Sequence, residues 1–510
     1  MMGRLQNSVK NAKVSITFTV ITLVLTFFSR KIFIDSLGVN LVGLTATLQN
    51  ILGFLNLAEL GIVSAIASTL YKPLYLEDKN CINDIISIYG YLYRKIGISI
   101  LCIGGLVSLF LPLFFRNSGV DIVDVYLGYW TYLGISMIGY FISYRQTLLD
   151  ADQKQYIVVA VTNIANISKI ILQIVCLKYL GCGYVVWLII EFVFGTIYGF
   201  WINSKVSQSY PWLTTSYKRG RLMRKEYVGL FDTIKKVIPH KLGSFVLNQT
   251  SNVLIYAFSS LSMVTFYNNY LLILSKAVFV ITTGFSGIGG SIGNLIAEGN
   301  REVIKRVFWE LHFWFFLLGS ILVITSYYLI EPFINLWLGD GFILDRLILI
   351  IMLFNIFVSI IRNPIGYYLN AYILFKDIWA PIAEATINLL CAIVLGYFYG
   401  ISGVLLGSSI SLLIIILIWK PYFLYKEAFH ESVLEYWIEF IKFILALFFT
   451  WFVISSCIHY VIGDSIDSFL SWIKAALILV SMALILYVFF AVLLCKGGKA
   501  AMKRMQSYFS

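Results

Sequence analysis

The chain alternates along its whole length between apolar runs and short polar breaks. The runs are about 18–25 residues long, and an α-helix needs roughly 20 apolar residues to cross a bilayer. Backbone polar groups in lipid must be satisfied within their own segment, so each run is expected to form a helix. The pattern predicts an all-α polytopic membrane protein with about fourteen transmembrane helices. The expected spans are 14–34, 41–67, 96–115, 124–145, 156–177, 184–204, 237–258, 262–290, 307–330, 346–371, 380–398, 401–420, 440–462 and 472–495.

The composition excludes the soluble classes of protein. Hydrophobic residues make up 60% of the 510 residues and charged residues 13%, and the mean hydropathy is +0.86. A soluble protein of this size would need a charged surface that this composition does not provide.

The placement of Lys and Arg predicts the orientation of the spans. With the amino terminus inside, most of the 38 Lys and Arg residues fall on the cytoplasmic side, and the densest cluster lies in the long loop 205–236. Both termini are therefore predicted to be cytoplasmic, and the first span is expected to remain as a signal anchor. The net charge of +12 follows from this arrangement, so no nucleic-acid partner is expected.

An internal repeat organises the first twelve expected spans. Residues 151–154, 163–164 and 180–183 have counterparts in the same order at residues 371 with 375–376, 388–389 and 400–403. Six spans return the chain to its starting side, so two such units share one topology and form two six-helix lobes around a central cleft. The predicted divisions are an N-lobe, a basic cytoplasmic linker, a C-lobe, and an appended helix pair with a cytoplasmic tail, at residues 1–204, 205–236, 237–420 and 421–510.

Four spans carry a polar stripe along one helical face, because their polar residues recur every three or four positions. The stripes are Ser15, Thr19, Thr22, Thr26, Ser29 and Arg30; Thr45, Gln49, Asn56 and Glu59; Lys241, Ser244, Asn248 and Ser251; and Thr265, Asn269, Lys276 and Thr283. Ionisable residues within a membrane usually line water or a ligand path, so we interpret the stripes as walls of a hydrated cleft. Hydrogen bonding between packed helices is the alternative.

The candidate site consists of the polar residues that these stripes and span 10 would turn toward the cleft. The substrate-binding candidates are Arg30, Asn56, Asn248, Lys276 and Arg362. Glu59 and Glu384 are candidates for ion coupling or for ion pairs, and an ion pair between Glu59 and Arg30 is the preferred interpretation. Pro364 is expected to bend span 10 beside Arg362.

The sequence has no P-loop, no G-x-S-x-G elbow and no spacing of residues typical of metal ligands. The longest expected outer loop, about residues 331–346, is shorter than the loops of membrane enzymes that transfer or polymerise glycans. We therefore expect a protein that is not an enzyme and holds no cofactor or metal. A glycan-modifying membrane enzyme is an alternative.

Three groups of residues resemble those of one exporter family. They are residues 29–33 with 37–38, 43–44 and 56–61; residues 362–364 with 375–376; and residues 381–382, 384–385, 388–389 and 400–404. With the length and the expected lobes, they resemble the polysaccharide-transporter branch of the multidrug/oligosaccharidyl-lipid/polysaccharide (MOP) exporter superfamily, which includes Wzx-type flippases. The motifs are specific to this branch and not to a substrate.

The resemblance implies that the protein moves a polyprenyl-pyrophosphate-linked oligosaccharide from the inner to the outer leaflet of the bacterial cytoplasmic (inner) membrane, for surface polysaccharide biosynthesis. It also implies alternating access coupled to an H⁺ or Na⁺ gradient or to the membrane potential. A polar cleft suits a sugar, and Arg and Lys suit a pyrophosphate. The expected partners are the lipid-linked oligosaccharide, membrane lipids and other membrane proteins of polysaccharide assembly. Two alternatives share the fold: a flippase for a peptidoglycan or teichoic-acid precursor, and a multidrug exporter.

Overall fold

The computed structural model describes residues 2–59, 61–227, 229–231, 234, 249–285, 288–374, 376–462 and 466–509. Within these ranges every regular element is helical, which confirms the predicted all-α fold class. Nine of the described helices are long and apolar enough to cross a membrane, when Arg346–Ala371 and Trp379–Phe429 are each counted once, with a tenth if the bent pair Ile21–Leu37 and Val39–Leu55 forms one span. The number of fourteen spans stays a prediction.

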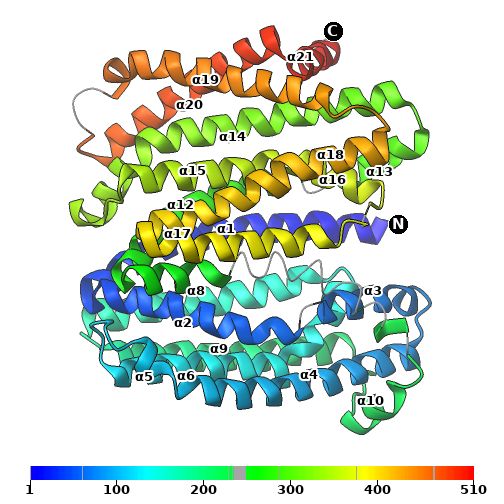
Figure 1. The fold of residues 1–510 in the computed structure, drawn as a ribbon. Coiled ribbons are helices and arrows are strands. Elements are labelled where there is room, and N and C mark those ends of the chain that lie inside the picture. Colours follow the sequence, from blue (N-terminus) through cyan, green and yellow to red (C-terminus); the bar gives the residue numbers. More distant parts are fainter. Residues whose placement is uncertain are drawn as a thin grey trace. The chain divides into compact units, whose positions relative to one another are not determined.

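The chain forms two compact units, Met1–Thr265 and Phe266–Ser510. In the first unit the long helices lie side by side, with α1 packed on α8, and α9 packed on both α6 and α8 (Figure 1). A further helical stretch covers residues 249–258. The elements are α1 (Met2–Leu37), α2 (Val39–Leu55), η1 (Asn56–Glu59), α3 (Ile62–Tyr75), α4 (Lys79–Ser108), α5 (Leu111–Phe114), α6 (Ile122–Phe141), η2 (Ser143–Gln146), α7 (Thr147–Ala151), α8 (Gln155–Tyr179), α9 (Tyr184–Ser209) and α10 (Tyr217–Met223).

Helix α12 leads from the first unit into the second, where α14 packs on α15 and α20, and α19 packs on α20 (Figure 1). Aromatic rings fill the core of this unit; Phe316 and Phe443, for example, are fully buried and stack with centroids 4.8 Å apart. The elements are α12 (Leu261–Gly284), α13 (Ile288–Glu298), α14 (Arg301–Leu338), η3 (Asp340–Phe342), α15 (Arg346–Ile361), α16 (Asn363–Ala371), α17 (Trp379–Ser411), η4 (Leu412–Trp419), α18 (Lys420–Leu424), η5 (Tyr425–Phe429), α19 (Leu434–Ile462), α20 (Phe469–Leu494) and α21 (Lys496–Phe509).

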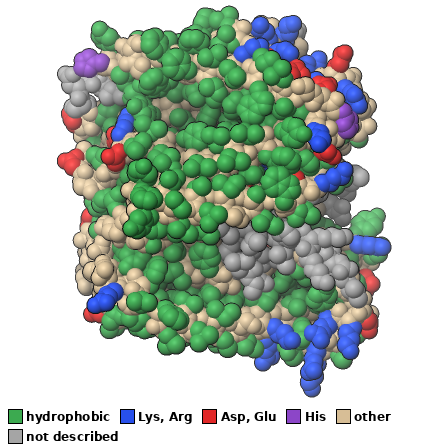
Figure 2. All heavy atoms as spheres, in the orientation of Figure 1, with side chains coloured by type: hydrophobic (Ala, Val, Ile, Leu, Met, Phe, Trp, Pro, Cys, Tyr) green, Lys and Arg blue, Asp and Glu red, His purple; other side chains and the backbone are tan. Residues whose placement is uncertain are grey.

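The outer faces of the helices are apolar. On α20, Leu477 and Ile485 expose about two thirds of their side chains, at 65% and 67%. Figure 2 shows hydrophobic side chains along the helices, and charged side chains gathered mainly near the helix ends. Exposing so large an apolar surface to water would cost free energy. This cost does not arise where the surface faces the hydrocarbon of a bilayer.

The second expected span is not one continuous helix. Helix α2 ends at Leu55, a 3₁₀ turn follows, and α3 begins at Ile62. Gly61, just before α3, has a φ of +83°, in the left-handed region that glycine adopts without strain. The expectation of a single helix over 41–67 is therefore wrong, because its apolar residues concealed a break.

The expected spans 380–398 and 401–420 form the two arms of a helical hairpin. The chain reverses at Gly400, which has a φ of +57° and a ψ of −134°, and the two arms of α17 run side by side (Figure 1). The arms touch through their backbones, because a Cβ atom on Gly403 would lie only 1.9 Å from the carbonyl oxygen of Leu395. Both spans are therefore helices of their own, joined by one residue.

The basic segment 205–236 contains a short helix that docks on α4. The guanidinium of Arg219 on α10 bonds to the carboxylate of Asp84 at 2.5 Å. Gly220 permits the close approach, because a Cβ atom there would lie 2.0 Å from the backbone oxygen of Ser87. The described part of this segment is thus an ordered element of the first unit.

Two tyrosines at the same end of the first unit add further anchors. The Tyr210 hydroxyl donates to a carboxylate oxygen of Asp152 at 2.7 Å, and the Tyr227 hydroxyl contacts Asp84 at 3.5 Å. Burial first, and then the hydrogen bond to the neighbouring side chain (Asp152 for Tyr210, Cys81 for Tyr227), raises the pKa of both hydroxyl groups. Both tyrosines therefore remain protonated donors at neutral pH.

The two units repeat each other in backbone detail. Helices α4 and α14 each begin at a cap residue whose side chain accepts from the backbone N–H three residues later. Two residues beyond the last residue of α7 and of α16, the chain has a residue of positive φ, and the next tight turn in each unit uses a glycine of positive φ. These corresponding pairs are Asp78 and Asn300, Gln153 and Ile373, and Gly181 and Gly400. They support an internal duplication, while the limits of the lobes stay a prediction.

Candidate functional site

Both units contain helices that are interrupted at corresponding places. In the first unit the chain breaks at residues 56–61, between α2 and α3, and again at 143–146, between α6 and α7. In the second unit it breaks between α12 and α13, and again at Arg362, between α15 and α16. Interrupted membrane helices in corresponding halves of a transporter mark its binding site, because their unwound ends offer polar groups at membrane depth.

The first of these breaks places Asn56 and Glu59 against tyrosines of α4 and α6. The Tyr140 hydroxyl donates to Asn56 Oδ1 at 2.9 Å, and Glu59 hydrogen-bonds to both Tyr93 and Tyr140. The ion pair between Glu59 and Arg30 stays a prediction.

The tyrosines extend this polar group along α4. The rings of Tyr89 and Tyr93 lie with centroids 4.2 Å apart, and Thr147 on α7 donates to the Tyr89 hydroxyl at 3.3 Å. Sequence analysis missed them because it began the third span at residue 96, whereas α4 begins at Lys79. A carboxyl group among hydroxyl and amide groups can hold a proton or bind sugar hydroxyls.

Part of the polar stripes joins helices within the first unit. Thr22 on α1, the helix that also carries the half-buried Arg30, donates to Asn163 on α8 at 3.2 Å. Thr265 donates to the backbone oxygen of Val39, the first residue of α2, at 2.7 Å. For these two threonines, the alternative of helix packing accounts for the polarity.

A part-buried ion pair joins α8 to α9. Lys169 Nζ lies 2.9 Å from Glu191 Oε2, and the buried Gln173 donates to Glu191 Oε1 at 3.1 Å. The side chains of Lys169 and Glu191 are only 20% and 13% exposed. Because each charge is neutralised by the other, we interpret this cluster as a structural link between α8 and α9.

Arg362 lies where α15 gives way to α16, and neighbouring residues supply the hydrogen bonds there. Pro364 has no N–H group to reach the carbonyl of Ile360, so that oxygen would be left without its helical donor. The side-chain amide of Asn363 compensates by donating to the carbonyl oxygens of Ser359 and Ile360, at 3.0 and 2.8 Å. Helix α15 ends at this point and leaves the Arg362 side chain exposed. Helix α15 thus ends and α16 begins beside Pro364, while the bend expected in span 10 stays a prediction.

Glu384 on α17 lies near this break. Its side chain is buried, and Arg362 and Lys420 are close enough to act on it electrostatically. Lys420 is itself bonded to the buried Asp377 at 2.6 Å. Within the described part of the chain no donor reaches Glu384 Oε1, so one carboxylate oxygen is open to a further partner. The structure therefore brings Arg362 and Glu384 into one region of the second unit.

The remaining candidates are Lys276 and Asn248. Lys276 is half-buried in α12, about two turns before this helix ends, and no acid of the described residues pairs with it. Asn248 lies outside the described residues. A central cleft shared by Arg30, Lys276 and Arg362 would involve both units, and it stays a prediction.

Comparison with solved structures shows which proteins share this fold. The lipid II flippase MurJ, in an inward closed conformation, matches with a TM-score of 0.66 at 16% identity over 94% of this chain and 98% of MurJ. An inward-facing multidrug resistance MATE family transporter of the MOP superfamily matches with a TM-score of 0.59 at 14% identity, over 81% and 98% of the two chains. The Vibrio cholerae MATE transporter VcmN gives a TM-score of 0.54 at 14% identity, over 85% and 99%.

The chain shares its fold with the lipid II flippase MurJ and with MATE transporters. No protein-family model and no curated protein sequence matches the chain. The matched proteins named above are a lipid flippase and multidrug transporters. At these identities the likeness concerns the fold alone, and the residues at the helix breaks must indicate the substrate.

Proposed function

We propose that this protein is a flippase that moves a polyprenyl-pyrophosphate-linked oligosaccharide from the inner to the outer leaflet of the bacterial cytoplasmic membrane by alternating access. The observation that carries the proposal is the presence of Lys276 and Arg362 near the helix breaks of the second unit, without ion-pair partners among the described residues. A pyrophosphate entering a region of low dielectric needs such cations, because an uncompensated charge there is very costly. Arg can bind it with paired donors and Lys as a point charge.

The first unit supplies the groups that suit the sugar. Asn56, Glu59 and the tyrosines beside them present amide, carboxyl and hydroxyl groups at one helix break. Such groups exchange their hydrogen bonds for those of sugar hydroxyls without leaving buried polar atoms unpaired.

The comparison with MurJ supports a lipid-linked substrate over a drug. MurJ is a lipid II flippase, and its structure covers 94% of this chain, whereas the two MATE structures cover 81% and 85%. Helices α19 and α20 are the pair that the sequence predicted in addition to the two six-helix lobes. A lipid-linked precursor of peptidoglycan or teichoic acid carries the same phosphate chemistry and is the main alternative.

The test is export in cells and in vesicles. Arg362→Ala and Lys276→Ala should each strongly impair glycan export in a flippase-deficient strain, while immunoblotted protein stays at the wild-type level. Lys474→Ala is the matched control, because Lys474 is an exposed cation on α20 without an ion-pair partner in the described part of the chain. The purified protein should also move a fluorescent polyprenyl-pyrophosphate oligosaccharide across proteoliposomes.

Two outcomes would overturn the proposal. Full export by both alanine variants would remove Lys276 and Arg362 from substrate binding. Transport of a cationic drug, but not of the lipid-linked oligosaccharide, would replace the flippase with a multidrug exporter.

A further inference from the structure

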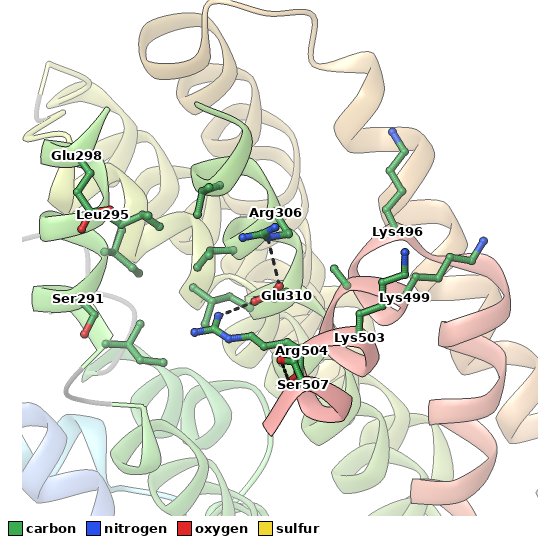
Figure 3. A pocket seen from close by; sticks show the side chains of 16 residues that line it. Ser291, Leu295, Glu298, Arg306, Glu310, Lys496, Lys499, Lys503, Arg504 and Ser507 are labelled. Atoms are coloured by element: carbon green, nitrogen blue, oxygen red, sulfur yellow. Dashed lines mark hydrogen bonds and ion pairs between the residues drawn. The ribbon is translucent and has the colours of Figure 1, made fainter. Parts of the chain in front are cut away.

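A pocket of about 1080 Å³ opens in the second unit between α13, the first turns of α14, and α21 (Figure 3). One part of its lining is apolar and includes Ile292 and Leu295 of α13 and Val307 of α14. Another part is cationic, with Lys499 and Lys503 projecting from α21. The pocket therefore offers apolar and charged surfaces side by side.

Helix α21 is held firmly at this pocket. A Cβ atom on Gly497 would lie 2.2 Å from the backbone oxygen of Trp309 on α14, and one on Gly498 would lie 2.4 Å from a backbone oxygen of α20. These glycines let the chain turn directly after α20 and press against α14. The backbone N–H of Lys496 also donates to the buried carboxylate of Glu439 at 2.9 Å. The cations of α21 are thus presented from a fixed support.

A single buried carboxylate positions two arginines at the wall of the pocket. Glu310 is only 5% exposed and accepts from Arg504 of α21 at 2.8 Å, while Arg306 lies 3.9 Å from its other oxygen (Figure 3). Lys499 and Lys503 have no ion-pair partner among the residues that the structure describes. The charged side chains that line the pocket are Arg306, Lys496, Lys499, Lys503 and Arg504, against Glu298 and Glu310. The pocket keeps a net positive charge.

We propose that this pocket binds the phosphate headgroup of an anionic phospholipid in the adjoining leaflet. Helix α21 follows α20, a candidate membrane span, after a single residue, so its lysines lie at the membrane surface. Basic clusters on an amphipathic helix directly beyond a membrane helix attract anionic headgroups. A free anion would have no use for the apolar lining, whereas a lipid places its glycerol and first acyl carbons there. The bound headgroup bridges α13 to α14 and α21.

The experiment measures lipid binding to the full-length protein in detergent by native mass spectrometry and by thermal shift. Phosphatidylglycerol is the principal probe, with phosphatidylcholine, inorganic phosphate and polyprenyl diphosphate as separate arms. We expect phosphatidylglycerol to bind and to raise the melting temperature, and the double variant Lys499→Gln/Lys503→Gln to bind it about 30-fold more weakly. The control Lys218→Gln/Lys225→Gln removes the same charge from the exposed basic segment and should bind as the wild type does.

Several results would overturn the proposal. Wild-type affinity in Lys499→Gln/Lys503→Gln would exclude the pocket, and an equal loss in the control would show attraction by net charge alone. If millimolar inorganic phosphate raised the melting temperature as much as phosphatidylglycerol does, the pocket would be a site for a free anion and not for a lipid. Tighter binding of polyprenyl diphosphate than of phosphatidylglycerol would make the pocket a substrate site. None of these results depends on whether the protein flips a glycan.

Discussion

Removing one partner of the ion pair between α8 and α9 should separate structural charges from those that bind substrate. Lys169→Met leaves the carboxylate of Glu191, only 13% exposed, with one hydrogen bond from Gln173. Breaking a buried ion pair on one side costs about 3–5 kcal/mol. This pair is part-buried and one donor to Glu191 remains, so the expected loss lies at the lower end, about 3 kcal/mol. For a unit of this size the melting temperature should fall by about 6–12 °C.

The assay is thermal unfolding in detergent, with the double variant Lys169→Met/Glu191→Gln beside the single one. The double variant removes both charges but keeps an acceptor for Gln173, so its stability should return to within about 1 kcal/mol of the wild type. Folded Lys169→Met should still export glycan, unlike Arg362→Ala. An unchanged melting temperature in Lys169→Met, or a double variant no more stable than the single one, would refute the reasoning.

Three further changes test the backbone features of the fold. Gly403→Leu should prevent the two arms of α17 from meeting and abolish the monodisperse peak in size-exclusion chromatography, whereas Gly366→Leu, where a Cβ meets open space, should leave that peak intact. Asn363→Ala should lower the free energy of unfolding by about 1–3 kcal/mol, because it uncovers carbonyl groups at the proline break, as denaturant titration would show. Arg219→Ala should speed tryptic cleavage near α10 without changing the melting temperature much, since its ion pair with α4 is partly exposed, and an unchanged cleavage rate would contradict the docking.

Hydropathy predicted most of the helices, because each apolar run must satisfy its own backbone in lipid. It separated the two arms of α17 although Gly400 alone stands between them. It also pointed to Pro364, which has no N–H group to donate and lies where α15 gives way to α16. The break at residues 56–61 escaped notice because leucine and alanine keep that stretch apolar, and only Gly61 marks the turn.

The site was predicted less completely than the fold. Asn56, Glu59 and Arg362 were chosen as ionisable or polar residues at membrane depth, and all three lie at helix breaks. The partners of Glu59 could not be found in the same way, because Tyr93 and Tyr140 belong to helices distant in sequence. Periodicity shows which face a residue occupies, but only tertiary packing decides which residue it meets.

The hairpin at Gly400 bears on how the chain is inserted during synthesis. The residues around the turn, Tyr397, Phe398, Tyr399 and Ile401, are apolar or aromatic, so no hydrophilic loop has to be carried across the bilayer. The two arms are synthesised one after the other. Their backbones touch where Gly403 has no side chain, and we expect this close contact to let the arms pair before they enter the lipid. We therefore expect the two arms to enter the membrane together as a helical hairpin. Their insertion should depend little on the motor that drives long polar segments through the translocon.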